Sequence, residues 1–217
     1  MEPEPIVRLR LYSRWQNSAG ERVRIALNLK SLAYAYVPVG SLAPGDYARL
    51  NPQGLLPALA VEGRIIAQST AILEYLEETH PTPPLLPRDP VLRAQARAFG
   101  QVIAADLHPI NNNRVRRYLT TRLGAAEAEV AAWYRHWMDL ALQALEASLA
   151  ARAEPWPFCF GDVPGWADLH LVPQLANARR FNCDLVPYPR LTAVEARCVP
   201  LGAFQRASPA AQPDFPG

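Results

Sequence analysis

The chain has 217 residues, of which 50% are hydrophobic and 19% are charged, and its formal net charge at pH 7 is +2. This length allows one large domain or two small ones, and the interspersed charges exclude a nucleic-acid-binding footprint. The apolar runs are far shorter than the roughly 20 residues that a membrane-spanning helix needs.

The cysteines and the first residues are typical of a reduced cytosolic protein. Cys159, Cys183 and Cys198 are odd in number and form no CxxC pair, so the sequence predicts neither a disulfide framework nor a metal site. Residues 1–5 are acidic and rich in proline, the opposite of a signal peptide. We therefore expect a soluble cytoplasmic protein without membrane or nucleic-acid partners.

The first eighty residues alternate between strand and helix patterns. The expected elements are a strand over 6–12, a helix over 18–30, a strand over 34–39, a short irregular or helical link over 45–50, strands over 56–61 and 64–66, and a helix over 68–79. The last two strands are joined by a two-residue turn that contains Gly63. This order, βαβ followed by ββα, predicts an α/β unit with a mixed four-stranded sheet.

The turn between the first strand and the first helix is where we expect an anion to bind. Ser18 stands at the N-terminus of the helix, where free backbone N–H groups and the helix dipole favour negative charge. Along that helix Val23 and Leu27 belong to an apolar stripe, whereas Arg22 and Arg24 lie off it. The alternative is that Ser18 only caps the helix.

Residues 81–90 contain five prolines and predict a linker. Beyond it the expected helices cover 91–119 with a kink at Pro109, then 125–153, 165–181, 190–198 and 201–207, before an extended tail over 208–217. In the second helix we expect one apolar face formed by Val130, Trp133, Trp137, Leu140, Ala144 and Leu145. The predicted architecture is an α/β domain over 1–81, a linker over 82–90 and an all-α domain over 91–217.

Local strings along nearly the whole chain resemble one known family. They are Leu11-Tyr12-Ser13, Arg22 to Leu27, Asn51-Pro52, Leu56-Pro57, Gln68-Ser69, Gly161-Asp162, Trp166 to Leu169, Leu171 to Gln174, Asn177-Ala178 and Arg180-Phe181. Together they resemble the cytosolic glutathione transferases of the zeta class, the maleylacetoacetate and maleylpyruvate isomerases. The resemblance implies a thioredoxin-like first domain that binds glutathione, an all-helical second domain that binds the substrate, and a homodimer.

Two strings of the first domain are expected to bind glutathione. Leu56-Pro57 opens a strand, where proline removes a hydrogen bond of the ladder. The resemblance implies that this bond is cis, so that the backbone of Leu56 pairs with glutathione; the alternative is an ordinary trans proline. Gln68-Ser69 lies at a helix N-terminus that would hold the γ-glutamyl carboxylate, cap the helix, or do both.

The resemblance places further site residues near the expected kink at Pro109. His108 and Asn112 match positions that line the cleft and would contact glutathione, although a lone histidine is more often structural. Arg114 and Arg180 match positions that would hold carboxylates of the substrate. Structural roles are expected for the remaining residues of interest: solvated charges for Arg116, Arg117 and Arg179, core packing for Trp133, Tyr134 and Trp137, and helix capping for Asp168.

Ser18 and Asn17 are the candidate catalytic residues. Lowering a thiol pKa of 8.5 by two units requires about 2.7 kcal/mol, and one charge-assisted hydrogen bond with a helix N-terminus is sufficient in magnitude. The zeta pattern at this turn is Arg-Ser-Ser-Cys or Arg-Ser-Ser-Ala, whereas this chain has Gln16-Asn17-Ser18-Ala19. The first serine of the pattern is therefore Asn17, and activation of the thiol is assigned to Ser18 with Asn17.

The resemblance implies a glutathione-dependent cis–trans isomerase of maleylacetoacetate- or maleylpyruvate-type acids. Glutathione would act as a cofactor, because its thiolate adds reversibly to the double bond. Two alternatives stay open: a glutathione transferase that conjugates or dehalogenates small electrophiles such as α-haloacids, and a glutathione-binding protein with little catalysis.

Overall fold

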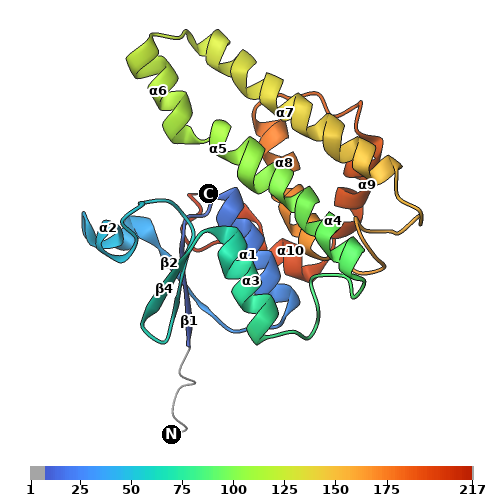
Figure 1. Cartoon of the computed structure of the whole chain (residues 1–217). Helices are drawn as coiled ribbons and strands as arrows, with labels where there is room; N and C mark the ends of the chain where they lie inside the picture. The colour runs from blue at the N-terminus through green and yellow to red at the C-terminus, as the bar shows by residue number, and fades with distance from the viewer. Residues whose placement is uncertain (1–7, 217) are drawn as a thin grey trace, which may run out of the picture. The chain divides into compact units, whose positions relative to one another are not determined.

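The computed structural model describes residues 8–216 (Figure 1). Residues 1–7, which include the acidic start and the first two residues of the expected strand over 6–12, and Gly217 lie outside the described residues. The chain divides into two compact units. Unit 1 contains the described residues up to Leu85 and those from Pro200 onward, and unit 2 is Leu86–Val199. The sequence-based division assigned all of 91–217 to the helical domain, whereas the last segment belongs to the α/β unit.

Unit 1 has the predicted βαβ-ββα order. Its elements are β1 (Leu9–Ser13), α1 (Ser18–Leu29), β2 (Ala35–Pro38), η1 (Val39–Ser41), α2 (Asp46–Leu50), β3 (Ala58–Val61), β4 (Arg64–Ala67), α3 (Ser69–Thr79), α10 (Gly202–Ala207) and η3 (Pro209–Ala211). Within residues 8–216 the sheet has four strands in the order β2-β1-β3-β4. β1 pairs parallel with β2 and antiparallel with β3, so the predicted mixed sheet is confirmed.

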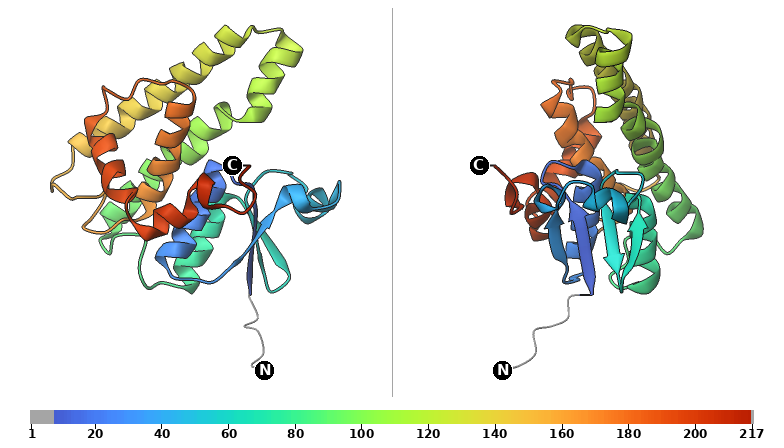
Figure 2. Two further views of the ribbon diagram at one scale, coloured as in Figure 1. Left: turned by 180° about the vertical axis from the view of Figure 1, so that it is seen from behind. Right: turned by 90° about the vertical axis from the view of Figure 1, so that its left-hand side faces the viewer.

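The helices of unit 1 are arranged in layers on the sheet. α1 and α3 lie on one face, and α2 lies on the other side (Figures 1 and 2). α10, although more than 170 residues away in sequence, packs against α1. The turn between β3 and β4 places Glu62 at φ 48° and Gly63 at φ 80°, which is the conformation of a tight hairpin turn.

Three charged residues of α1 are buried, against the expectation for two of them. Arg22 is 1% exposed, Arg24 is fully buried, and Glu21 is 7% exposed. Burial lowers the pKa of Arg22 to about 10, and the neighbouring Glu21 carboxyl opposes that change. The guanidinium of Arg22 is therefore a cation at neutral pH inside the unit, and burial lowers the pKa of Arg24 as well. The helical pattern did not reveal this burial, because the groups that enclose them are distant in sequence.

Lys30, the only lysine of the chain, is a further buried cation of unit 1. Its Nζ donates to Glu77 Oε2 at 2.8 Å and to the carbonyl oxygens of His80 and Pro83 at 2.6 and 2.9 Å. Glu77 also accepts from the backbone N–H of Leu85. This network joins the end of α1 to α3 and to the proline-rich segment that follows it.

Unit 2 is helical, as predicted. Its elements are α4 (Pro90–Gln101), the π-helical segment η2 (Val102–Leu107), α5 (His108–Ile110), α6 (Asn113–Leu123), α7 (Glu127–Ala150), α8 (Trp166–Arg180) and α9 (Pro189–Cys198). α8 packs against both α4 and α9, and α7 also contacts α9. Among the described residues no helix has the length and apolarity required to span a membrane.

The expected helix over 91–119 is interrupted rather than simply kinked. Pro109 has no N–H to donate to the preceding turn, and the backbone just before it, in η2, is π-helical. Asn112 then starts a new helix, because its side chain accepts a hydrogen bond from the backbone N–H of Arg114 at 3.0 Å. The helix is thus disturbed near Pro109, as predicted, but by a π-helical segment and a break at Asn111 and Asn112.

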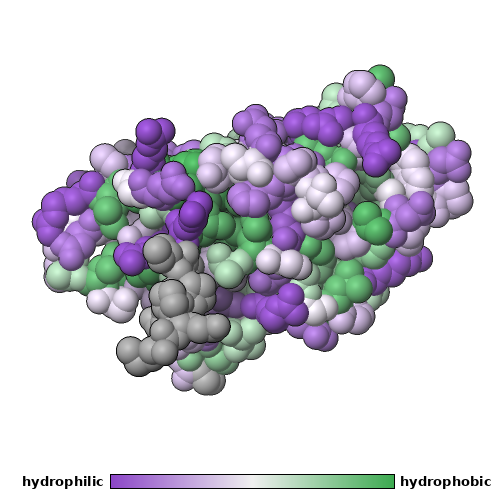
Figure 3. Space-filling model, turned by 90° about the horizontal axis from the view of Figure 1, so that it is seen from below, coloured by the Kyte–Doolittle hydropathy of each residue, from purple (hydrophilic) through white to green (hydrophobic). Residues whose placement is uncertain are grey.

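The buried face of α7 differs from the expected one. Its buried apolar residues are Val130, Tyr134, Met138, Leu142, Leu145 and Leu149. Leu140, which was expected in the core, is 46% exposed, and Trp133 and Trp137 are only half-buried. The prediction of core packing is therefore confirmed for Tyr134 and wrong for Leu140 and Ala144, which is also exposed. On the molecular face drawn in Figure 3, hydrophobic residues lie scattered among hydrophilic ones.

Asp168 caps α8 as predicted. Its Oδ2 accepts from the backbone N–H of Gly165 at 2.8 Å, and its Oδ1 accepts from that of Cys159 at 2.9 Å. The side chain is 1% exposed, and burial raises its pKa. Asp168 therefore fixes the loop before α8 and the start of that helix.

Replacing Glu21 with Gln tests the burial of charge in α1. Burial raises the pKa of Glu21 in the folded protein from 4.5 to about 7, so folding takes up a proton between these values. The stability of the native protein should fall as the pH rises through this window, by roughly 3 kcal/mol. Because Gln does not titrate, the free energy of unfolding of E21Q minus that of the wild type should rise from pH 4.5 to 7 and then level off.

Urea unfolding followed by circular dichroism at several pH values measures this difference. Glu78→Gln, on the exposed surface of α3, controls for the loss of one carboxyl group. A difference for E21Q that is constant with pH would contradict the burial of an ionisable group at this position.

Candidate functional site

The predicted site residues fall into two groups, one in each unit. Unit 1 contains Asn17, Ser18, Leu56-Pro57 and Gln68-Ser69, all of which lie at ends of strands or helices. Unit 2 contains the other four, which are His108, Asn112, Arg114 and Arg180.

Asn17, rather than Ser18, caps α1. Asn17 has extended backbone angles, and its Oδ1 accepts from the backbone N–H of Gly20 at 2.5 Å. Ser18 is the first residue of the helix, so the alternative in which Ser18 provides the cap is wrong. Because the cap uses the side-chain oxygen of Asn17, its Nδ2 is the atom that can donate to a ligand.

Gly20 is a residue of this turn that sequence analysis overlooked. A Cβ at Gly20 would lie 2.1 Å from Ser13 Oγ and 2.7 Å from Asn17 Oδ1. The close contact with Asn17 therefore requires glycine. Its position in the sequence could have indicated this role. Gly20 lies three residues after Asn17, and the side chain of an N-cap residue accepts a hydrogen bond from the backbone N–H at that spacing.

The N-terminus of α3 has the features of an anion site. Gln68 precedes the helix at φ 71°, in the left-handed region, and makes no side-chain cap; its Nε2 instead donates to Gln53 Oε1 at 2.6 Å. Ser69 is 7% exposed and begins the helix. The first N–H groups of α3 can therefore bind a carboxylate.

Arg22 is a buried cation beside this N-terminus. Its Nη1 donates to Ser69 Oγ at 3.4 Å, whereas its Nε and Nη2 have no hydrogen-bond partner among residues 8–216. A buried guanidinium without a carboxylate on it favours negative charge nearby. The sequence pattern did not indicate Arg22, because it lies off the apolar stripe of α1.

The Leu56–Pro57 peptide bond is cis, as expected. The pairing of β3 with its neighbours begins at Ala58, so the backbone of Leu56 lies outside the ladder. The preceding carbonyl, of Leu55, accepts from the Tyr47 hydroxyl at 2.6 Å and from Asn51 Nδ2 at 2.8 Å. α2 and the residue that follows it therefore hold the loop that presents Leu56.

In unit 2 His108, Asn112 and Arg114 lie on either side of the break before α6. His108 is half-buried at the start of α5, and Arg114 is exposed. Asn112 Oδ1 is used as the cap of α6. The part of Asn112 that can bind a ligand is therefore its amide nitrogen.

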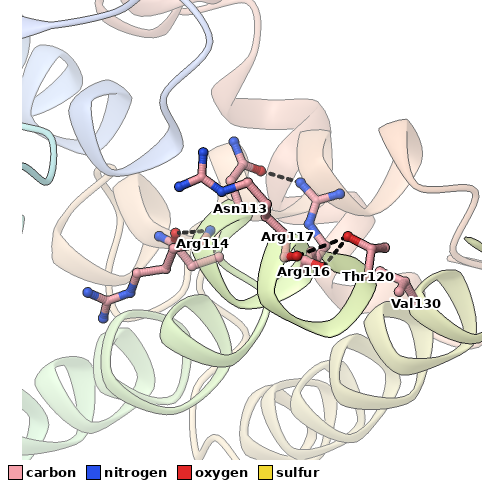
Figure 4. Close-up of a pocket in the computed structure, with 7 residues that line it drawn as sticks. Asn113, Arg114, Arg116, Arg117, Thr120 and Val130 are labelled. Atoms are coloured by element: carbon pink, nitrogen blue, oxygen red, sulfur yellow. Dashed lines mark hydrogen bonds between the residues drawn. The ribbon is translucent and has the colours of Figure 1, made fainter. Parts of the chain in front are cut away.

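A pocket of about 560 Å³ lies on α6 and the start of α7 (Figure 4). It is lined by Asn112, Asn113, Arg114, Arg116, Arg117, Thr120 and Val130. The lining contains three arginines, and no acidic residue is among the seven. Figure 4 shows Arg116 directed at Asn113 and Arg114 extending away from them. The pocket is therefore suited to anions.

Two arginines stack on the ring of Phe181. The guanidinium carbon of Arg116 lies 4.4 Å from the ring centroid and that of Arg180 lies 4.8 Å from it. The expectation that Arg116 is merely solvated is therefore wrong. Phe181 also packs on the ring of Tyr134 at 3.9 Å between centroids. Burial raises the pKa of Tyr134 to about 12, although both arginines oppose this change.

Arg179 and Arg180 differ in their surroundings. Nη1 and Nη2 of Arg179 donate to the two carboxylate oxygens of Glu195, so Arg179 belongs to an ion pair instead of being only solvated. Arg180 is exposed at the end of α8.

Comparison with known proteins gives concordant results. The family model of the glutathione S-transferase N-terminal domain matches residues 18–79. A maleylpyruvate isomerase from Ralstonia sp is 46% identical over 211 residues, which cover 95% of this chain and 99% of the relative.

Two solved structures extend the comparison to the fold. One is a holo structure of a maleylpyruvate isomerase, a bacterial glutathione S-transferase of the zeta class, with a TM-score of 0.89, 46% identity and coverage of 94% of this chain and 99% of that one. The other is a maleylacetoacetate isomerase from Methylobacterium extorquens AM1 with bound malonate and glutathione (GSH), with a TM-score of 0.89, 38% identity and coverage of 96% and 100%.

Proposed function

Because this chain belongs to the zeta class of the glutathione transferases, we propose that it is a glutathione-dependent cis–trans isomerase of maleylpyruvate- or maleylacetoacetate-type acids. The observation that carries the proposal is the 46% identity to a maleylpyruvate isomerase over 99% of that relative. In keeping with the family, we further propose a homodimer in the cytoplasm.

The residues of unit 1 fit glutathione. The buried Arg22 and the free N–H groups at the start of α3 are suited to the γ-glutamyl carboxylate, with Ser69 between them. The backbone of Leu56, outside the β3 ladder, can pair with the cysteinyl amide. In unit 2, His108 and the amide nitrogen of Asn112 are proposed as further contacts.

Asn17 and Ser18 are proposed to stabilise the thiolate. They precede and begin α1, so the helix N-terminus favours negative charge beside their side chains. Bound glutathione supplies a thiolate that adds reversibly to the cis double bond and so permits rotation about it. The hydroxyl of Ser18 and Nδ2 of Asn17 would each donate a charge-assisted hydrogen bond to the sulfur.

Arg180 and Arg114 are proposed to hold the carboxylates of the substrate. Arg180 stacks on the ring of Phe181, and a guanidinium can bind a carboxylate through two parallel hydrogen bonds. Arg114 belongs to the pocket with three arginines, whose charge favours a dianion. The relative from Methylobacterium extorquens AM1, solved with malonate, is a precedent for a bound dicarboxylic acid.

The reaction is tested by following the ultraviolet absorbance of maleylpyruvate and maleylacetoacetate with purified protein and glutathione. We expect the trans product to form while the concentration of glutathione stays constant. Parallel incubation with an α-haloacid measures conjugation. Consumption of glutathione in proportion to product would instead support the transferase alternative, and no change in either substrate would support a protein that only binds glutathione.

Replacing Ser18 with Ala should raise the pKa of the bound glutathione thiol by about one unit, because one donor to the sulfur is lost. The affinity for glutathione should stay within a few-fold, since its carboxylate is held at α3. Titration of the thiolate absorbance gives the pKa, and equilibrium dialysis gives the affinity. If S18A keeps the pKa of the wild type while Asn17→Ala raises it, the role belongs to Asn17.

Replacing Arg180 with Gln should raise the KM for the acidic substrate about 10-fold or more, because a charged partner of the carboxylate is removed. The thiol pKa should not change. Arg179→Gln is the matched control: it breaks the ion pair with Glu195 on the neighbouring residue and should leave KM within about 2-fold. Equal effects of the two substitutions on KM would contradict the assignment of Arg180.

A further inference from the structure

The C-terminal segment of unit 1, residues 200–216, is held against α1 by side chains of that helix. Asn28 Nδ2 donates to the carbonyl of Ala203 at 2.9 Å, and Arg24 Nε donates to that of Ala207 at 2.8 Å. Within the segment, Gln212 Nε2 donates to the carbonyls of Arg206 and Ser208. These bonds give the last residues of the chain a defined position on the α/β unit.

This segment reaches the turn between β1 and α1 at Trp15. The backbone N–H of Trp15 donates to Asp214 Oδ2 at 3.0 Å. Its indole ring packs edge-to-face on Phe215, with 5.1 Å between the centroids. Its carbonyl accepts from Arg24 Nη2 at 3.3 Å, and Arg24 is itself bonded to Ala207. Every polar backbone group and the ring of Trp15 are therefore held directly or indirectly by the C-terminal segment.

The Asp214 carboxylate has a second partner in the sheet. Its Oδ1 accepts from the hydroxyl of Tyr36 at 2.9 Å. Tyr36 lies on β2 opposite Leu11 of β1, so its position is fixed by the parallel ladder. Asp214 thereby connects a rigid strand to the backbone of the turn, through two hydrogen bonds that are stronger than neutral ones because the acceptor is charged.

We propose that Asp214 is a positioning residue for the thiolate site. Trp15 precedes Asn17 by two residues and Ser18 by three, so an N–H fixed at Trp15 limits where the two donors can lie. Donors that stabilise a charge must be held to within about 0.5 Å of their working geometry. Asp214 does this from the opposite end of the chain, through the backbone of Trp15. The effect on the thiol pKa and on kcat rests on the proposed function, whereas the effect of Asp214 on the position of the turn does not.

The test compares Asp214→Ala, Asp214→Asn and Tyr36→Phe with Asp139→Ala. Asp139 accepts from the Tyr188 hydroxyl in unit 2, so D139A removes the same kind of Tyr–Asp bond far from the turn in sequence. For D214A we expect a bound glutathione thiol pKa about one unit higher and a kcat about 10-fold lower, with KM for the substrate within about 2-fold. D214N, which keeps an acceptor for the Trp15 N–H, should recover most of this loss, and Y36F should have a smaller effect than D214A.

Hydrogen exchange of the free protein gives a readout that needs neither glutathione nor turnover. Amides of residues 15–20 should exchange faster in D214A and at the wild-type rate in D139A. Faster exchange without isomerase activity in the wild type would disprove the proposed function and leave the positioning role intact. If D214A does not fold, D214N and Y36F provide the comparison. Wild-type exchange and an unchanged thiol pKa in the folded Asp214 variants would overturn the proposal.

Discussion

The guanidinium of Arg24 is enclosed among three backbone carbonyls that come from both ends of the chain. It donates to Arg14 and Trp15, which lead into α1, and to Ala207, which ends α10. Its three nitrogens each reach a different carbonyl, and this spread of donors over one plane could not be reproduced by the single nitrogen of a lysine. The turn before α1 and the C-terminal segment therefore depend on each other. If either left its native position, the buried charge of Arg24 would lose a hydrogen-bond acceptor.

Much of unit 1 could be predicted because its signals are local. Alternation, helical spacing and the turn at Gly63 gave the βαβ-ββα order, and the family resemblance gave the cis bond before Pro57. Arg22 and Arg24 show where local reasoning stops. Both lie off the apolar stripe of α1, yet they are buried because Ser69 and Ala207, 47 and 183 residues away, supply their acceptors. No periodicity in a single helix contains that information.

In unit 2 the limits were of another kind. A proline predicts a disturbance near Pro109, but the new helix after it depends on the side chain of Asn112 accepting from the backbone, which competes with continuation of the helix. For α7, several apolar faces were compatible with the sequence, and packing against η2 and α9 selected the one that contains Tyr134 and Met138. In the candidate site the residue types could be predicted from the sequence. The stacking of Arg116 and Arg180 on the ring of Phe181 could not, because it depends on tertiary packing.

The burial of Lys30 has a consequence for chemical modification. This residue is the only lysine of the chain, and its amine is fully enclosed by Glu77, His80 and Pro83. Reagents that acylate amines must reach the nitrogen, which is exposed only when α1 and α3 separate. The rate at which Lys30 is acylated therefore measures how often α1 and α3 separate in unit 1.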